Sequence, residues 1–103
     1  MGRPRHTRKD SNQSEIVEEL RSLNFMVIDV ADFASAGCDI FVCGFHRRWL
    51  LPMWLAVEVK APGGTLTKTE EERAAEMEYK FGDDAPYIVA YEPDDVLQWF
   101  GAL

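Results

Sequence analysis

The pattern of apolar and polar residues along the chain predicts elements in the order αβββαβα. Helical spacing predicts a first helix over 12–23, with Asp10 or Ser11 as its N-cap. Asn24, in a left-handed backbone conformation, is expected to end it. The side chains expected on its buried face are Ile16, Val17, Leu20 and Leu23. Short apolar runs then predict strands. The expected strands are 25–30, 38–43, 53–60 and 86–91.

The capping-box sequence Thr67-Lys68-Thr69-Glu70 opens a second predicted helix, which ends near Phe81-Gly82. Its narrow apolar stripe consists of Ala74, Met77 and Phe81. A closing helix over 93–100 is expected to turn Val96, Leu97 and Phe100 inward. The chain shows no internal repeat and no second core. Its 103 residues therefore predict one α/β domain over 11–103, preceded by a flexible arm over 1–10.

Strands 38–43 and 53–60 are predicted to form an antiparallel hairpin. If Asp39 lies opposite Glu58, the turn centres on Arg48-Trp49, inside the polar-tipped connection 44–52. Opposed side chains have Cβ atoms roughly 5 Å apart, so the two carboxylates could share one ion. Lys60 lies on the same face, about 6 to 7 Å farther along. The opposite face, turned toward a helix, takes Leu55, Val57 and Val59.

Two carboxylates and an ammonium at the ends of apolar strands are costly to place without compensation. In the absence of metal, repulsion between the carboxylates should raise one pKa. An oxygen-only pair suits Mg²⁺ or Mn²⁺ better than zinc. Lys60 would orient an attacking water and neutralise charge on a phosphorane, with Glu15 as a candidate third carboxylate. A solvent-exposed cross-strand cluster of acids and a lysine explains the same spacing equally well.

The net charge of −7 argues against a protein that coats nucleic acid. The charge is uneven, because the first nine residues carry +4 and residues 10–103 sum to −11. The basic residues of the arm are Arg3, Arg5, Arg8 and Lys9. They are interpreted either as DNA contacts or as a solvated tail. Arg47 and Arg48, at the hairpin tip, are further candidates for contact with DNA phosphates.

Cys38 and Cys43 fall on opposite faces of one predicted strand, roughly 16 Å apart, which is too far for a disulfide. His6 and His46 lack metal-ligand spacing and are expected in solvent, in the arm and at the hairpin tip. No apolar run reaches transmembrane length, and the N-terminus lacks the apolar stretch of a signal peptide. A cytoplasmic protein without a membrane partner is therefore expected.

Together these motifs resemble the VRR-NUC family of the PD-(D/E)XK nuclease superfamily, especially its short stand-alone members of phage type. The similar segments run from about Arg8 to Gly101. They are Lys9–Val17, Gly37-Cys38-Asp39-Ile40, Glu58-Val59-Lys60, Leu66-Thr67, Ile88-Val89 and Asp94–Leu97. The resemblance implies a restriction-endonuclease-like αβββαβ core, with a mixed central sheet flanked by helices and a short C-terminal helix.

The resemblance also implies roles for individual residues. The implied catalytic residues are Asp39, Glu58, Lys60 and Glu15, and the implied metal ligands are Asp39, Glu58 and the Val59 carbonyl. The implied cofactor is Mg²⁺, for which Mn²⁺ could substitute, with no organic cofactor. The chain departs from the family at Cys38, which replaces a proline, and at Glu70, which stands where glutamine is usual. Glu70 is interpreted as a capping-box acid or as an added negative charge beside the metal.

The expected function is that of a metal-dependent endodeoxyribonuclease selective for branched DNA such as Holliday junctions. A four-way junction offers two strands to cut and the domain has one site, so a C2 homodimer is expected. If the chain is phage-encoded, it would act in the host cytoplasm. Two alternatives stay open: a DNA-binding module that keeps the nuclease fold with little or no catalysis, and a structural α/β domain whose charged cluster is incidental.

Overall fold

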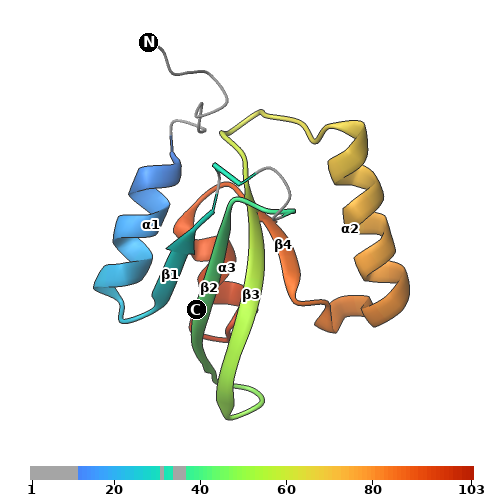
Figure 1. The fold of residues 1–103 in the computed structure, drawn as a ribbon. Coiled ribbons are helices and arrows are strands. Elements are labelled where there is room, and N and C mark those ends of the chain that lie inside the picture. The colour runs from blue at the N-terminus through green and yellow to red at the C-terminus, as the bar shows by residue number, and fades with distance from the viewer. Residues whose placement is uncertain (1–11, 31, 34–36) are drawn as a thin grey trace.

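The computed structural model describes residues 12–30, 32–33 and 37–103, which form a four-stranded mixed sheet with three α-helices (Figure 1). In chain order the elements are α1 (Gln13–Ser22), β1 (Met26–Asp29), β2 (Ile40–His46), β3 (Leu51–Val59), α2 (Lys68–Phe81), the 3₁₀ turn η3 (Gly82–Asp84), β4 (Tyr87–Ala90) and α3 (Pro93–Trp99). The predicted order αβββαβα and the α/β class are thereby confirmed.

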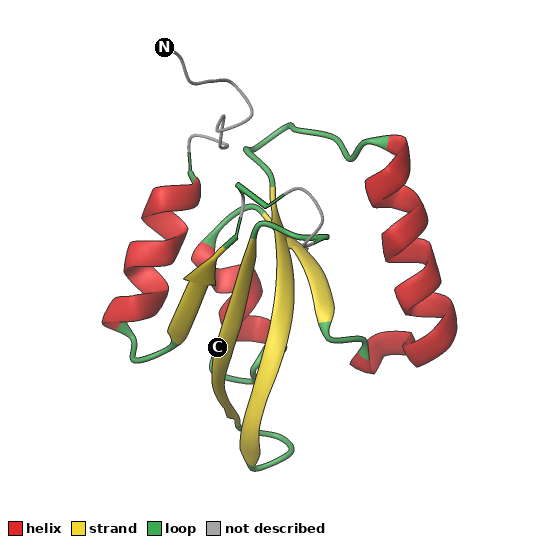
Figure 2. Cartoon of the chain, viewed as in Figure 1, coloured by secondary structure: helices red, strands yellow, loops and turns green. Residues whose placement is uncertain are grey.

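The strands lie in the order β1-β2-β3-β4. Pairing is antiparallel from β1 to β3, whereas β4 runs parallel to β3. A parallel neighbour requires a crossover connection, and α2 supplies it. Figure 2 shows the helices outside the sheet, with α1 on the β1 side, α2 on the β4 side and α3 behind the strands.

One face of the sheet packs against α1 and α3 and forms the core. The fully buried apolar side chains of the strands are Ile40, Val42, Leu55, Val57, Val59 and Ala90. The fully buried apolar side chains of the helical segments are Ile16, Leu20, Val96 and Phe100. Alternation of side chains along each strand places every second residue on this face. The prediction that Leu55, Val57 and Val59 face a helix is confirmed.

The β2–β3 hairpin has the predicted register, because Ile40 pairs with Val57 and Phe41 with Ala56. Both strands are longer than expected, since the ladder continues to the pair His46–Leu51. The connection is therefore only residues 47–50, centred on the predicted Arg48-Trp49. Of the apolar residues assigned to the connection, Phe45, Leu51 and Pro52 belong to the strands, whereas Trp49 and Leu50 stay in the turn.

The start of α1 differs from the expectation. Its N-cap is Asn12, whose side chain makes no capping hydrogen bond. Instead the Asn12 side-chain amide donates to the carbonyl oxygens of Lys60 at 3.0 Å and Tyr91 at 2.7 Å. These bonds tie the start of α1 to the chain just after β3 and β4. The caps suggested at Asp10 and Ser11 lie outside the described residues.

Two apolar side chains expected inside are exposed. Leu23 is 46% exposed because α1 ends at Ser22 and the chain turns there, with Asn24 in the predicted left-handed conformation at φ 74°. Phe81 is 54% exposed, and α2 as a whole buries no residue fully. Helix α2 therefore packs against the sheet over a small area. Among the described residues, no helix is long and apolar enough to cross a membrane.

Candidate active site

Asp39 and Glu58 meet where the β2–β3 ladder ends. The Asp39 amide donates to the Val57 carbonyl at 3.0 Å, and the Asp39 carbonyl accepts from the Val30 amide at 2.9 Å. The regular ladder ends at the Ile40–Val57 pair, and Asp39 lies one residue beyond it, bonded to the carbonyl of the same Val57. The carboxyls of Asp39 and Glu58 are nevertheless close enough to hydrogen-bond to each other. Both side chains point away from the core face, because Ile40 and Val57 point into it.

The Asp39 carboxylate is anchored to the neighbouring strand. Its Oδ2 atom accepts a hydrogen bond from the Val59 amide at 2.8 Å. Backbone groups of alternate residues in a strand face the same side, so the Val59 carbonyl faces β2 as the Val57 carbonyl does. The Val59 carbonyl thus faces the same side of β3 as the amide that binds Asp39.

Glu58 is a buried acid, with 6% of its surface exposed. Burial, and after it the adjacent carboxyls of Asp39 and Glu70, together raise the pKa of its carboxyl to about 9. The rise agrees with the expectation that two close carboxylates without a cation cannot both ionise easily. At neutral pH the metal-free site therefore holds a proton on this pair.

Lys60 is held by Glu70 across the gap between β3 and α2. The Lys60 ammonium lies 2.9 Å from Glu70 Oε1, and both side chains are largely buried. The same oxygen accepts from the Thr67 amide at 2.8 Å, while Thr67 Oγ1 accepts from the Glu70 amide at 3.2 Å, which completes the predicted capping box. Burial acts to raise the pKa of Glu70, but the Thr67 amide and Lys60 outweigh it and the pKa is lowered.

A hollow of about 230 Å³ opens over this end of the sheet. Its wall includes Asp39, Glu58, Glu70, Thr67, Gly37 and Arg73. Cys38 also borders it, and burial raises the pKa of this thiol to about 11, so it stays protonated at neutral pH. The hollow is therefore an acidic site whose border also carries one arginine.

The donor set suits a hard divalent cation. Its carboxylate and carbonyl oxygens are the ligands that Mg²⁺ and Mn²⁺ prefer. Burial, and then the neighbouring carboxyls, raise the pKa of Glu58, and a bound cation would act in the opposite direction. No group of three or more His, Cys, Asp or Glu side chains arranged for a metal occurs among the described residues. An ion held by Asp39, Glu58 and the Val59 carbonyl would therefore keep several waters, as Mg²⁺ usually does.

Other predicted site residues lie elsewhere. Glu15 is on the exposed side of α1 and does not line the hollow. Arg47 and Arg48 are exposed at the far end of the hairpin, roughly 25 Å along the strands from the carboxylates. The basic residues Arg3, Arg5, Arg8 and Lys9 lie outside the described residues.

The expectation that His46 is solvated is wrong. Its side chain has no exposed surface, and its Nδ1 accepts from the amides of Arg48 and Trp49, both at 3.2 Å. The ring stacks on Trp49 at 4.5 Å between centroids and meets Trp99 edge-on at 5.0 Å. Because β2 extends through residue 46, strand alternation carries His46 to the core face with Ile40 and Val42.

Sequence reasoning did not identify Arg73. It follows Glu70 by three residues in α2, so the two side chains share one side of the helix. This three-residue spacing is the only feature of the sequence that links Arg73 to the site.

No family model, no curated protein and no solved structure matches this chain. The nuclease resemblance therefore remains a prediction that rests on the motifs themselves.

Proposed function

We propose that the chain is a metal-dependent endodeoxyribonuclease that hydrolyses DNA phosphodiester bonds, with a restriction-endonuclease-like core. The observation that carries the proposal is the pairing of buried Glu58 with Asp39 at the end of the β2–β3 hairpin, with Lys60 two residues after Glu58. Buried like charges are costly, and protein sites keep them chiefly where they bind an ion or a proton.

In this proposal Asp39, Glu58 and the Val59 carbonyl hold Mg²⁺, or Mn²⁺ in its place. The bound ion supplies Lewis acidity toward the phosphate and a water of lowered pKa. The Val59 amide fixes the orientation of Asp39 through its 2.8 Å bond. Glu58 must release its proton for the ion to bind, because the pKa of its carboxyl is raised to about 9.

Lys60 is the proposed source of positive charge for the transition state. Its ammonium sits in an ion pair with Glu70 at the edge of the hollow. From this position the Lys60 ammonium can orient a water and neutralise charge on the phosphate oxygens. The ion pair with Glu70 restricts how far the ammonium can move. Glu15 is retained as a candidate helix-one acid whose exposed carboxylate would meet the substrate from outside the hollow.

The proposed substrate is branched DNA such as a Holliday junction, cut by a C2 homodimer. An exposed apolar row on the same sheet face as the carboxylates supports the proposed dimer. Met26, Cys43 and Trp54 form one cross-strand row there, and Met26 and Trp54 are 59% and 48% exposed. This uncharged row lies about 13 Å along the strands from Asp39 and Glu58, so a partner could cover it without closing the hollow.

The decisive experiment incubates purified protein with Mg²⁺ or Mn²⁺ and a panel of junction, flap, duplex and single-stranded DNAs. Wild-type protein is expected to cut the junction, and Asp39→Ala or Glu58→Ala should abolish cutting. Glu18→Gln, an exposed acid of α1, is the matched control and should leave cutting unchanged. Wild-type activity in either alanine variant would refute the assignment. Sedimentation of wild type and Trp54→Glu tests the dimer.

A second candidate is a DNA-binding module that keeps this fold without efficient catalysis. The ion pair between Lys60 and Glu70 favours it, because the lysine that should serve the phosphate is engaged by an acid. Titration of Mn²⁺ by calorimetry separates the two. A nuclease binds the ion through Asp39 and Glu58, and loses it in Asp39→Ala, whereas a binding module has no requirement for an ion there. For either candidate we propose action in the cytoplasm.

A further inference from the structure

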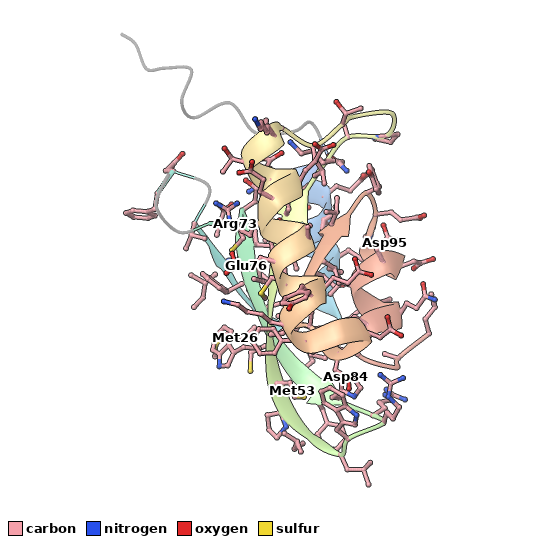
Figure 3. All side chains as sticks on the ribbon, turned by 90° about the vertical axis from the view of Figure 1, so that its right-hand side faces the viewer. Met26, Met53, Arg73, Glu76, Asp84 and Asp95 are labelled. Carbon is pink, nitrogen blue, oxygen red and sulfur yellow. The ribbon has the colours of Figure 1, made fainter. Side chains whose placement is uncertain are left out.

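Arg73 places a guanidinium at the border of the acidic hollow. In Figure 3, Arg73 and Met26 lie on the side of the sheet away from α3, which carries Asp95. This is the face that carries Asp39 and Glu58, so the arginine borders the hollow from the α2 side.

The arginine lies directly over Gly37, the residue two before Asp39. A Cβ atom built on Gly37 would lie 3.4 Å from Arg73 Nε and 3.7 Å from Arg73 Cζ, so the side chain packs on the glycine backbone. Gly37 has φ +83°, a conformation that glycine adopts without strain. The segment that positions Asp39 thus also positions the Arg73 guanidinium.

The charge of Arg73 is not consumed by an ion pair. The ion pairs found within the described part of the chain are Lys60–Glu70 and Lys80–Glu76, and Arg73 takes part in neither. Its guanidinium lies within hydrogen-bonding reach of the Tyr87 hydroxyl and near the Cys38 thiol. Burial raises the pKa of both groups overall, and the guanidinium acts to lower it. A half-buried guanidinium has five donors in a planar fork, so it can bond to the Tyr87 hydroxyl and still offer donors to a ligand.

We propose that Arg73 binds a non-bridging oxygen of the DNA phosphate that enters this hollow, and is therefore a substrate-binding residue. The inference rests on the proposed nuclease function. Asp39 and Glu70 repel a phosphate, and Lys60 is already paired with Glu70, so a phosphate needs a further cation beside the metal. The planar fork of arginine matches two phosphate oxygens, a geometry that lysine cannot reproduce.

The test compares Arg73→Gln, Arg73→Lys and a control, Lys80→Gln, which removes one positive charge from the same helix about 10 Å away. Binding of junction DNA is measured with Ca²⁺ in place of Mg²⁺ over a series of salt concentrations, and cleavage is measured with Mg²⁺. Arg73→Gln should lower kcat/KM roughly 10- to 100-fold and reduce the salt slope of binding by about 1. Arg73→Lys should keep the slope and recover only part of the rate.

A role limited to balancing the acidic cluster predicts a different result. Arg73→Gln would then change thermal stability and tighten Mn²⁺ binding, with the salt slope of DNA binding unchanged. Equal slopes and rates for Arg73→Gln and Lys80→Gln would overturn the inference. If Arg73→Gln fails to fold, Arg73→Lys decides: wild-type kcat/KM in that variant overturns the bidentate contact.

The outcomes separate this inference from the proposed function. If wild-type protein binds DNA but cuts none, the nuclease proposal fails, and the salt slope of Arg73→Gln still decides whether Arg73 contacts phosphate. If wild-type protein cuts and Arg73→Gln behaves as Lys80→Gln does, the nuclease proposal stands and the role of Arg73 is refuted. If wild-type protein neither binds nor cuts, both are refuted.

Discussion

The Asp39 carboxylate accepts the backbone amide hydrogen of Val59 at 2.8 Å, so the acid that precedes β2 is fastened to the end of β3. Glu58 is the residue before Val59, and its buried carboxyl faces the same hollow. One hydrogen bond therefore fixes the distance between the two acids. A backbone amide thus holds Asp39, while hydrogen bonds among the carboxyls and the ion pair of Lys60 with Glu70 hold the rest of the site.

Glu58 should make the metal-free protein less stable as the pH rises. Its folded pKa is about 9, against an ordinary value of 4.5, so between these pH values the folded state holds a proton that the unfolded state has released. Stability is then full below about pH 4.5 and falls toward pH 9. Glu58→Gln should remove this slope and be more stable than wild type at pH 8.5 by roughly 2 kcal/mol. Urea unfolding in the presence of EDTA at several pH values measures this pH dependence of the free energy of unfolding.

The matched control for this series is Glu18→Gln, an exposed acid of α1. Its pH slope should equal that of wild type. A wild-type slope in Glu58→Gln would contradict the assignment of the buried proton to Glu58.

Metal binding should displace the same proton. Affinity for Mn²⁺ is expected to rise with pH by up to about tenfold per unit and to level off near pH 9, because a protonated Glu58 cannot ligate the ion. Calorimetry at pH 7.5 in two buffers of different ionisation enthalpy should show release of close to one proton per ion. Identical heats in the two buffers would mean that the ion binds elsewhere or that Glu58 is already ionised.

Glu70→Gln should raise the rate of DNA cleavage. Glutamine keeps the capping role at this position, but it removes one negative charge from the hollow and releases Lys60 from its ion pair. We expect kcat/KM to rise roughly 3- to 10-fold, because a phosphate meets less repulsion. Glu72→Gln, an exposed acid of the same helix, should leave the rate unchanged. A lower rate in Glu70→Gln would make Glu70 a required member of the site.

Gly44→Ala should destabilise the fold, because a Cβ atom there would lie 2.3 Å from two ring carbons of Phe25. That ring packs against Phe100 at 5.1 Å between centroids, so displacing it would disturb this contact. We expect a loss of about 1 to 3 kcal/mol in the free energy of unfolding. Ser14→Ala, on the exposed side of α1, should change it by less than about 0.5 kcal/mol. Equal unfolding curves for the two variants would contradict a steric clash between a Cβ atom at position 44 and the Phe25 ring.

The pairing of Asp39 with Glu58 could be predicted from sequence because hairpin register depends on local features. The polar turn at Arg48-Trp49 and the two-residue alternation of apolar side chains leave one register that buries Leu55 and Val57. A shift of one residue would move both to the open face. Local pattern was therefore enough to bring two acids together from different strands.

Arg73 and the ion pair of Glu70 could not be predicted in the same way. Their place depends on how α2 rests on the sheet after the turn at residues 61–67. Helix α2 buries no residue fully, so its apolar pattern is too weak to specify the angle and depth of that contact. Helical spacing indicates that Glu70 and Arg73 share a side, but it does not indicate what that side faces.

His46→Phe should lose stability through hydrogen bonding alone. The phenyl ring can keep the stack on Trp49, but it offers no acceptor to the amides of Arg48 and Trp49. Leaving these amides without their acceptor should cost roughly 1 to 3 kcal/mol, and His46→Leu should cost more because the stack is lost as well. Nitrogen NMR of wild-type protein should show hydrogen on Nε2, since Nδ1 accepts from both amides. Unfolding curves of His46→Phe equal to wild type would show that the turn does not depend on this acceptor.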